Sequence, residues 1–209
     1  MQAIRLTFKK LDSLKYISHL DLNRLFMRMI KRCHLHIWYT QGYNPHAHIV
    51  FSPPVSVGVS SLCEIADIKL LDDLEKNDIL TALNSVSPSG ILFVSAKEPV
   101  NKINKIAYAK YNISIKTTTT VKELENLKKS DRIIVVKKTK TKEIDFDIKP
   151  YYKDIEFKEK DGFIDFEVIL PSSNDLTVKV DLLLSVIKDI TDVKIQREEF
   201  LDENFDTFI

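Results

Sequence analysis

The apolar and polar positions of the first hundred residues follow the two periods that distinguish strands from helices. Three segments have the alternating or short apolar pattern of strands: residues 4–10, 64–70 and 90–97. After Ser18, apolar residues recur instead every three or four positions, which predicts a helix over residues 18–33 with Asp21 in its first turn. A second helical pattern covers residues 73–83.

Two further segments predict a hairpin between the first helix and the middle strand. Residues 36–40 and 48–51 have strand composition. They flank a turn in which Gly42 is free to adopt a positive φ and Asn44 is held extended by Pro45. The resulting order of strands and helices is that of the ferredoxin-like split β-α-β arrangement. We therefore expect residues 1–100 to form one such domain, with the hairpin inserted in its middle.

The second half of the chain repeats this outline after a linker at residues 99–104. Strands are expected at residues 107–116, 132–138, 141–148, 155–158, 163–170 and 193–197, and helices at residues 120–128 and 180–190. The basic run from Lys137 to Lys142 is expected at a hairpin tip. The predicted fold class is therefore α+β, with two ferredoxin-like (split β-α-β) units at residues 1–100 and 101–209.

The apolar runs and the cysteines of the chain indicate the cellular compartment in which we expect the protein. No run of about 18 apolar residues is present, so no membrane span is expected, and the first residues lead straight into a strand rather than a signal peptide. Cys33 and Cys63 are spaced as neither a disulfide framework nor a zinc pair, which suits a reducing environment. We expect a cytoplasmic protein.

Charge is strongly segregated along the chain, although the net charge is only +1. Residues 1–60 carry eight Lys/Arg against two Asp/Glu, and residues 101–142 carry twelve against three. Residues 61–100 carry three against seven, and residues 143–209 carry eight against eighteen. Such blocks favour basic patches that can meet RNA or an acidic protein, and an acidic end that can meet a basic partner.

A stripe of cations is predicted along the exposed side of the first helix. It consists of Arg24, Arg28, Lys31 and Arg32. The stripe is either a solvated helix surface or a site for phosphates. Together with Trp38, Tyr39 and Tyr43 it provides the mixture of cations and aromatic rings that single-stranded RNA sites use. Strand alternation would bury either Trp38 or Tyr39, and the sequence does not choose between them.

Polar residues at the helix start and in the turn are candidates for a substrate pocket. They are His19, Asp21, Gln41, Tyr43, Asn44 and His46. A helix N-terminus beside a polar turn can bind an anion, and its histidines can exchange protons. In the alternative interpretation, Asn44 and His46 support the turn while Asp21 caps the helix. No nucleophile with an adjacent base is evident, so we assign no catalytic residue.

Paired histidines make metal binding a further hypothesis. His34 and His36, like His46 and His48, would share one face of an extended segment, and Cys33 lies beside them. No carboxylate occurs at regular ligand spacing, so surface or turn-supporting histidines are favoured. We assign neither a metal nor a cofactor.

The motifs of this region resemble a known family. The chain resembles the signature of the bacterial radical SAM-linked protein family, a domain of unknown function. The similar segments are SHLDLNRLFMRMIKR and, after it, YTQGYNPHAHIVFSPPVSVGVSSLCEIADIKL. The resemblance covers most of residues 1–100. The matching family positions are Ser18, His19, Asp21, Arg24, Arg32, Gln41, Gly42, Asn44, Pro45, His46, Gly58, Glu64 and Asp67.

The resemblance implies an accessory protein that is fused to, or encoded beside, a cobalamin-binding radical SAM protein. Two cysteines cannot supply the three-cysteine iron–sulfur motif of a radical SAM enzyme, so the chain would act as a partner. We expect a substrate-recognition protein that binds RNA or an RNA-linked substrate and is not an enzyme on its own. The alternatives are an enzyme with a polar, metal-assisted or metal-free pocket around His19 and His46, or a purely protein-binding adaptor that uses its acidic C-terminal segment.

Overall fold

The computed structural model describes residues 1–138, 142–173 and 175–208, and strands predominate in it. In chain order the elements are β1 (Gln2–Lys10), η1 (Asp12–Tyr16), α1 (His19–Arg32), β2 (Ile49–Phe51), β3 (Ser60–Leu70), α2 (Lys76–Val86), β4 (Ile91–Lys97), η2 (Ile103–Lys105), β5 (Tyr108–Lys116), α3 (Val121–Lys128), β6 (Ile134–Lys138), β7 (Glu143–Asp147), α4 (Lys149–Tyr152), β8 (Lys158–Lys160), β9 (Phe163–Pro171), α5 (Val180–Leu184) and β10 (Asp192–Leu201). The η elements are short 3₁₀ helices.

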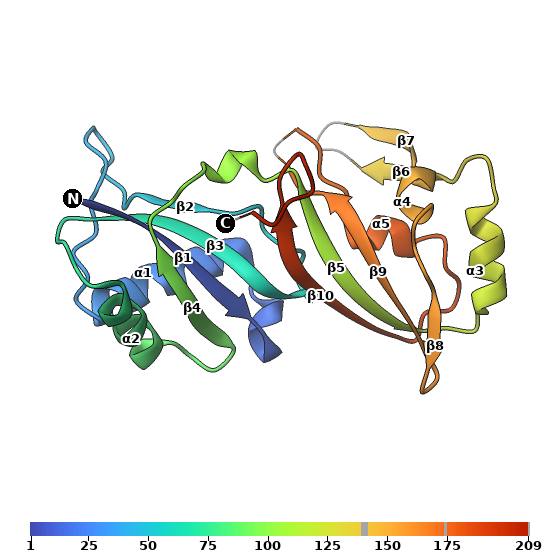
Figure 1. The fold of residues 1–209 in the computed structure, drawn as a ribbon, viewed down its shortest axis with the longest axis horizontal. Coiled ribbons are helices and arrows are strands. Elements are labelled where there is room, and N and C mark those ends of the chain that lie inside the picture. Colours follow the sequence, from blue (N-terminus) through green and yellow to red (C-terminus); the bar gives the residue numbers. More distant parts are fainter. Residues whose placement is uncertain (139–141, 174, 209) are drawn as a thin grey trace.

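One eight-stranded sheet runs through both halves of the chain (Figure 1). Its order is β4-β1-β3-β10-β5-β9-β8, with β2 on the other side of part of β3. Every neighbouring pair is antiparallel except β3 and β10. The mixed α+β class expected from the sequence is therefore confirmed, with a mostly antiparallel sheet.

The first half places α1 and α2 against β1, β3 and β4. Its sheet order, β4-β1-β3-β2, puts β3 between the two strands that α1 connects, as a split β-α-β connection requires. The Ser18 side chain accepts a hydrogen bond from the backbone N–H of Asp21, which confirms the predicted helix start. Leu22, Phe26 and Met29 of α1 are buried against the sheet, each worth roughly 1.5–3 kcal/mol of burial free energy.

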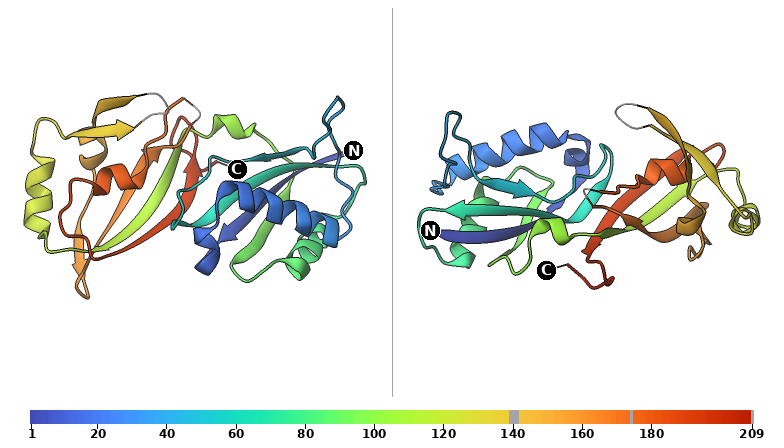
Figure 2. Two further views of the ribbon diagram at one scale, coloured as in Figure 1. Left: turned by 180° about the vertical axis from the view of Figure 1, so that it is seen from behind. Right: turned by 90° about the horizontal axis from the view of Figure 1, so that it is seen from above.

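The second half has the sheet order β10-β5-β9-β8, and β6 and β7 form a separate hairpin. Inward residues of β5 and β9 alternate with outward ones, and the inward set packs under α3, α4 and α5. In the view from above, α1 and α5 lie on the same side of the sheet, whereas the C-terminus lies on the other (Figure 2). The outer surfaces of β5, β9 and β10 consequently face away from α1 and α5.

The two halves meet where β3 and β10 run side by side. Only two residue pairs make this parallel contact, Gln196 with Ser60 and Arg197 with Ser61. Arg197 is fully buried there: its guanidinium donates to Glu64 Oε1 at 2.5 Å and to the carbonyl oxygen of Pro53 at 2.8 Å. A buried ion pair thus lies at the junction.

Several predicted elements differ in extent from those observed. Residues 36–40 form isolated bridges rather than a regular strand. Two backbone bonds join them to the other arm of the hairpin, from Thr40 N to His46 O and from His48 N to Trp38 O, and Trp38 N also donates to Lys69 O of β3. The predicted helix over 180–190 ends at Leu184, and the chain later turns through Asp189 at φ 49°. The expected tip of the β6–β7 hairpin includes residues 139–141, which lie outside the described residues.

Candidate functional site

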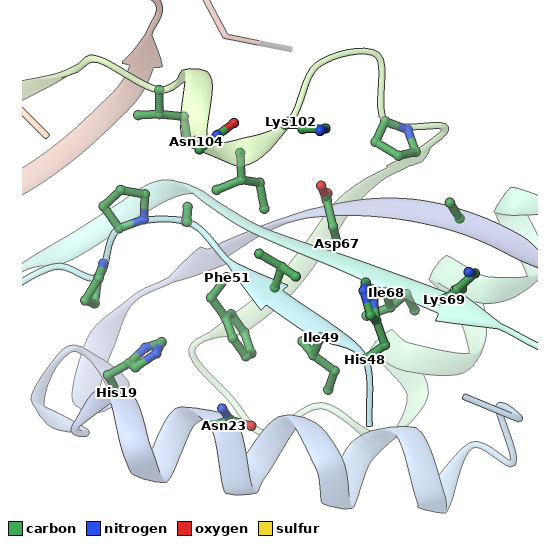
Figure 3. Close-up of a pocket in the computed structure, with 18 residues that line it drawn as sticks. His19, Asn23, His48, Ile49, Phe51, Asp67, Ile68, Lys69, Lys102 and Asn104 are labelled. Atoms are coloured by element: carbon green, nitrogen blue, oxygen red, sulfur yellow. The ribbon is translucent and has the colours of Figure 1, made fainter. Parts of the chain in front are cut away.

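A groove of about 840 Å³ follows β2 (Figure 3). The start of α1 borders it on one side and the segment carrying η2 on the other. Ile49, Phe51 and Ile103 contribute apolar surface. The polar residues that line it are His19, Asn23, His48, Ser52, Asp67, Lys69, Lys102 and Asn104. This size and mixture are usual for a small-molecule or nucleotide site.

Two histidines from different elements line this groove. His19, the first residue of α1, packs edge-on against Phe51, with ring centroids 5.4 Å apart. His48 packs edge-on against Trp38 at 5.6 Å. Its Nδ1 is buried and has no hydrogen-bond partner within the described part of the chain. Because buried polar atoms in proteins are normally satisfied, this nitrogen is a candidate ligand contact.

The single carboxylate of the groove is already neutralised. The Nε–H group of Arg5 donates to Asp67 Oδ1 and its Nη2–H group donates to Asp67 Oδ2, both at 2.8 Å. Nη2 also donates a hydrogen bond to the carbonyl oxygen of Asn101. Lys69 Nζ lies 4.8 Å from the centroid of the Trp38 ring. With Asp67 paired, Lys69 and Lys102 give the groove a positive character, which favours an anionic ligand.

The residues predicted to share one pocket occupy two separate places. His19 and Asp21 are at the start of α1, whereas Gln41, Tyr43, Asn44 and His46 lie at the tip of the arm that follows its end (Figures 1 and 2). A helix of 14 residues is about 21 Å long, so the helix separates the two groups. Of the six residues, His19 alone lines the groove in Figure 3.

Each group has its own hydrogen bonds. Ser18 Oγ donates to Asp21 Oδ2 at 2.7 Å, and this bond lowers the pKa of Asp21, with a smaller contribution from Arg24. At the tip, the Nδ1 atom of His46 is 3.0 Å from Thr40 Oγ1. Asp21 therefore holds the capping side chain of Ser18 and His46 supports the turn, while Tyr43 is fully exposed.

The cationic stripe is exposed, as expected. Arg24 contacts Asp21 at 3.2 Å, but Arg28, Lys31 and Arg32 make no ion pair within residues 1–138, 142–173 and 175–208. At the end of α1 a hollow of about 360 Å³ adjoins them. Its lining comprises Ile30, Lys31, His34, Leu35, His36, Ile37, Tyr39 and Leu71. The structure thus brings a cation, two histidines and an aromatic ring to one surface.

The hollow also shows which aromatic ring of the predicted hairpin is accessible. Tyr39 is 42% exposed, whereas Trp38 is half-buried between His48 and Lys69. His36 Nδ1 lies 2.6 Å from Asp72 Oδ2. His34 and His36 gave a sequence signal for this place, as surface histidines or as metal ligands. In the groove, His48 gave a signal only through its pairing with His46, and Lys102 and Asn23 gave none.

No cluster of three or more His, Cys, Asp or Glu side chains suited to a metal occurs among the described residues. His34 and His36 line the hollow at the end of α1, and His48 lines the groove. Within the same residues, no helix has the length and apolar character needed to cross a membrane.

The sequence profile of one bacterial family matches residues 3–182. The chain belongs to the family DUF2344. This family is described as "Uncharacterized protein conserved in bacteria". No curated protein matches the chain. Among solved structures, this DUF2344 protein is similar to one chain of the "Crystal Structure of a Cbf5-Nop10-Gar1 Complex", with a TM-score of 0.50 and 12% identity. The match covers 94% of the present chain and 48% of that chain, and it concerns the fold alone.

Several motif positions of this DUF2344 protein have structural partners. Asp67 pairs with Arg5, and Glu64 pairs with Arg197. Gly58 has φ 91°, a conformation that favours glycine. The accessible polar residues that remain near a hollow or groove are His19 and the cations at the end of α1. They define the candidate functional surface.

Proposed function

We propose that this DUF2344 protein is a substrate-recognition protein that binds single-stranded RNA or an RNA-linked substrate through α1 and the arm that follows it. The observation that carries the proposal is the surface at the end of α1. Lys31 and Tyr39 line one hollow there, and Arg28 and Arg32 are exposed on the same helix. Cations without internal partners attract phosphates, and accessible rings stack on bases of any sequence.

The groove beside β2 supports the same proposal by its shape and charge. Its volume of about 840 Å³ exceeds the needs of one nucleotide-sized group. Lys69 and Lys102 favour an anion, and the buried, unpaired Nδ1 atom of His48 offers a hydrogen bond. In the proposed arrangement, the α1 surface binds the RNA backbone and the groove receives the part of the substrate to be modified.

The proposed partner is a cobalamin-binding radical SAM protein, and this part rests on the motif resemblance alone. Purification of the chain from its own host at low ionic strength tests it. Recovery of a radical SAM protein in stoichiometric amount is expected. Recovery of the chain with RNA but without such a protein would remove the partner and leave the RNA proposal standing.

We further interpret the chain as two ferredoxin-like units, residues 1–100 and 101–209, joined by the β3–β10 contact. The repeated strand order supports this interpretation. The units are not independent in their cores, because Val59 and Ile65, from the first half, pack in the apolar cluster of the second half. Unfolding followed by Trp38 fluorescence, which reports the first half, and by far-UV circular dichroism should therefore give coincident transitions.

Fluorescence anisotropy with a labelled single-stranded oligoribonucleotide tests the RNA proposal. The triple variant Arg28→Gln, Lys31→Gln, Arg32→Gln should bind at least roughly tenfold more weakly at low salt, because up to three phosphate contacts are lost. The affinity of the triple variant should also depend less steeply on salt than that of the wild type. The slope of log association constant against log salt concentration should become shallower by up to about 0.7 for each phosphate contact removed.

A matched triple variant controls for net charge. This variant removes three exposed cations from the second half, by the changes Lys122→Gln, Lys153→Gln and Lys160→Gln. This variant should retain most of the affinity, because its changes lie outside the α1 surface. Equal weakening by the two triple variants would show non-specific attraction and would contradict the proposed site.

A further inference from the structure

A second groove crosses the outer face of β9, β5 and β10, on the side of the sheet away from α1. It has a volume of about 570 Å³. The register places Lys110 of β5 between Ile169 of β9 and Glu199 of β10, so these three outward side chains form its floor. Tyr151 of α4 and the residues that follow α4 border one end, and the loop after β10 borders the other.

Three aromatic side chains line this groove: Tyr108, Tyr151 and Phe205. The rings of Tyr108 and Phe205 stack at 4.5 Å with an interplanar angle of 17°. Phe205 nevertheless remains 56% exposed, so its ring is accessible. It is the only large apolar side chain of the tight loop that follows β10. An exposed ring held in a fixed position is suited to recognise a partner.

The loop holds Phe205 by a costly conformation. Phe205 has φ 65°, which is uncommon for a side chain of this size. The turn is fixed by Asp202, whose Oδ1 accepts bonds from the backbone N–H groups of Asn204 at 2.8 Å and Asp206 at 3.1 Å. Strain of this kind persists only where the surroundings determine it, and it is frequent at binding sites.

The charge of the groove is negative. Asp154, Glu167 and Glu199 line it, and Lys110 is its only cation. Lys110 Nζ lies 3.0 Å from Glu167 Oε2, and this contact, followed by the charges of Glu199 and Glu198, raises the pKa of Lys110. The neighbouring hollow adds Glu156, Asp165 and a second cation, Lys158, whose Nζ lies 3.6 Å from Glu156 Oε2. Two ammonium groups thus face five carboxylates beside exposed aromatic surface, so the net charge of this surface is negative.

We propose that this groove binds an arginine-containing basic segment of a protein partner. A guanidinium combines the two contacts that the groove offers, because it pairs with carboxylates through a planar fork and stacks on aromatic rings. RNA is repelled by the same carboxylates. The proposal is independent of the RNA surface on α1, which lies on the other side of the sheet.

The test uses the full chain and an acetylated dodecapeptide of alternating arginine and serine, measured by isothermal titration calorimetry. The double variant Glu167→Gln, Glu199→Gln should weaken binding by roughly fivefold or more, since two partly exposed charge contacts are lost. Phe205→Ala should also weaken it, without affecting either carboxylate. Lys110→Gln should strengthen binding, because the competing internal cation is removed. This gain cannot result from misfolding.

Glu159→Gln provides the matched control, because Glu159 is exposed on β8 and lies outside the groove. Its affinity for the peptide should equal that of the wild type. The proposal is overturned if the groove variants and the control bind alike, or if a lysine–serine peptide binds as tightly as the arginine peptide. It is also overturned if Phe205→Ala abolishes self-association of the chain while no peptide binds, which would assign the groove to a second copy.

Discussion

Replacing Glu64 by glutamine should destabilise the protein more than replacing Arg197, its ion-pair partner, by methionine. The reason is the composition of the buried cluster at the junction of the two halves. Glu64 is 3% exposed and faces two buried cations, Arg197 at 0% and Lys10 at 3%. Burial lowers the pKa of Lys10, while the charge of Glu64 raises it again. Glu64→Gln leaves two cations without a counter-charge, whereas Arg197→Met leaves Glu64 facing Lys10.

The magnitude follows from the burial of the pair. Removing one partner of a buried ion pair costs about 3–5 kcal/mol, because the other charge is left uncompensated. We expect the free energy of unfolding to fall by about 4–5 kcal/mol for Glu64→Gln and by about 2–3 kcal/mol for Arg197→Met. Since the free energy of unfolding of a domain is about 5–15 kcal/mol, the first change removes roughly a quarter or more of the stability.

Urea unfolding, followed by far-UV circular dichroism and Trp38 fluorescence, provides the assay. With a slope of about 2–3 kcal/mol per molar urea, the midpoint should fall by roughly 1.5–2 M for Glu64→Gln and by about 1 M for Arg197→Met. Adding Lys10→Met to Glu64→Gln should recover part of the loss.

An exposed ion pair serves as the control for this assay. Lys76 and Glu98 are 3.2 Å apart with side chains 44% and 75% exposed, so Glu98→Gln should change the free energy of unfolding by less than about 1 kcal/mol. The reasoning would be refuted if Arg197→Met cost as much as Glu64→Gln, or if both cost no more than the exposed control.

Three further predictions concern single residues. Burial lowers the pKa of Lys10 below 10.5, so the folded state binds this proton more weakly than the unfolded state does. The free energy of unfolding of the wild type, relative to that of Lys10→Met, should therefore rise as the pH of urea titrations increases from neutral towards about 10. Gly90→Ala should lower the free energy of unfolding, measured by thermal denaturation, by more than about 1 kcal/mol, because φ is 93° and the new Cβ would lie 2.7 Å from the carbonyl oxygen of Leu11. Gly162→Ala, at φ 75° with open space around it, should lower it by less. Burial raises the pKa of the Cys63 thiol to about 12, so Cys63 should resist a disulfide reagent near pH 8 until the chain unfolds, and rapid labelling of the folded protein would contradict its placement.

Local signals predicted the helix of the first half well. The spacing of Leu22, Phe26 and Met29 and the capping side chain of Ser18 all lie within one segment, and the structure confirms both. The strand expected at residues 163–170 is likewise observed as β9, which pairs with β8 across the turn at Asp161 and Gly162. These elements are determined by contacts between residues close in sequence.

Contacts between distant residues could not be predicted in the same way. A single arginine in an alternating strand gives no sign that Arg197 will be buried against Glu64, 133 positions away. The groove beside β2 likewise depends on Lys102, from the linker, lying opposite His19. The expected pocket of His19 and His46 joined residues that are close in sequence, but the rigid length of α1 keeps them apart.

The location of bound RNA tests the central claim most directly. Ultraviolet cross-linking of the full chain to a 4-thiouridine-labelled single-stranded oligoribonucleotide, followed by mass spectrometry of the peptides, identifies the residues in contact. The account predicts cross-links within residues 28–48, above all at Tyr39 and Tyr43, the most exposed rings near the cations of α1. Cross-links confined to the outer face of β5, β9 and β10, or no cross-links at low salt, would contradict it.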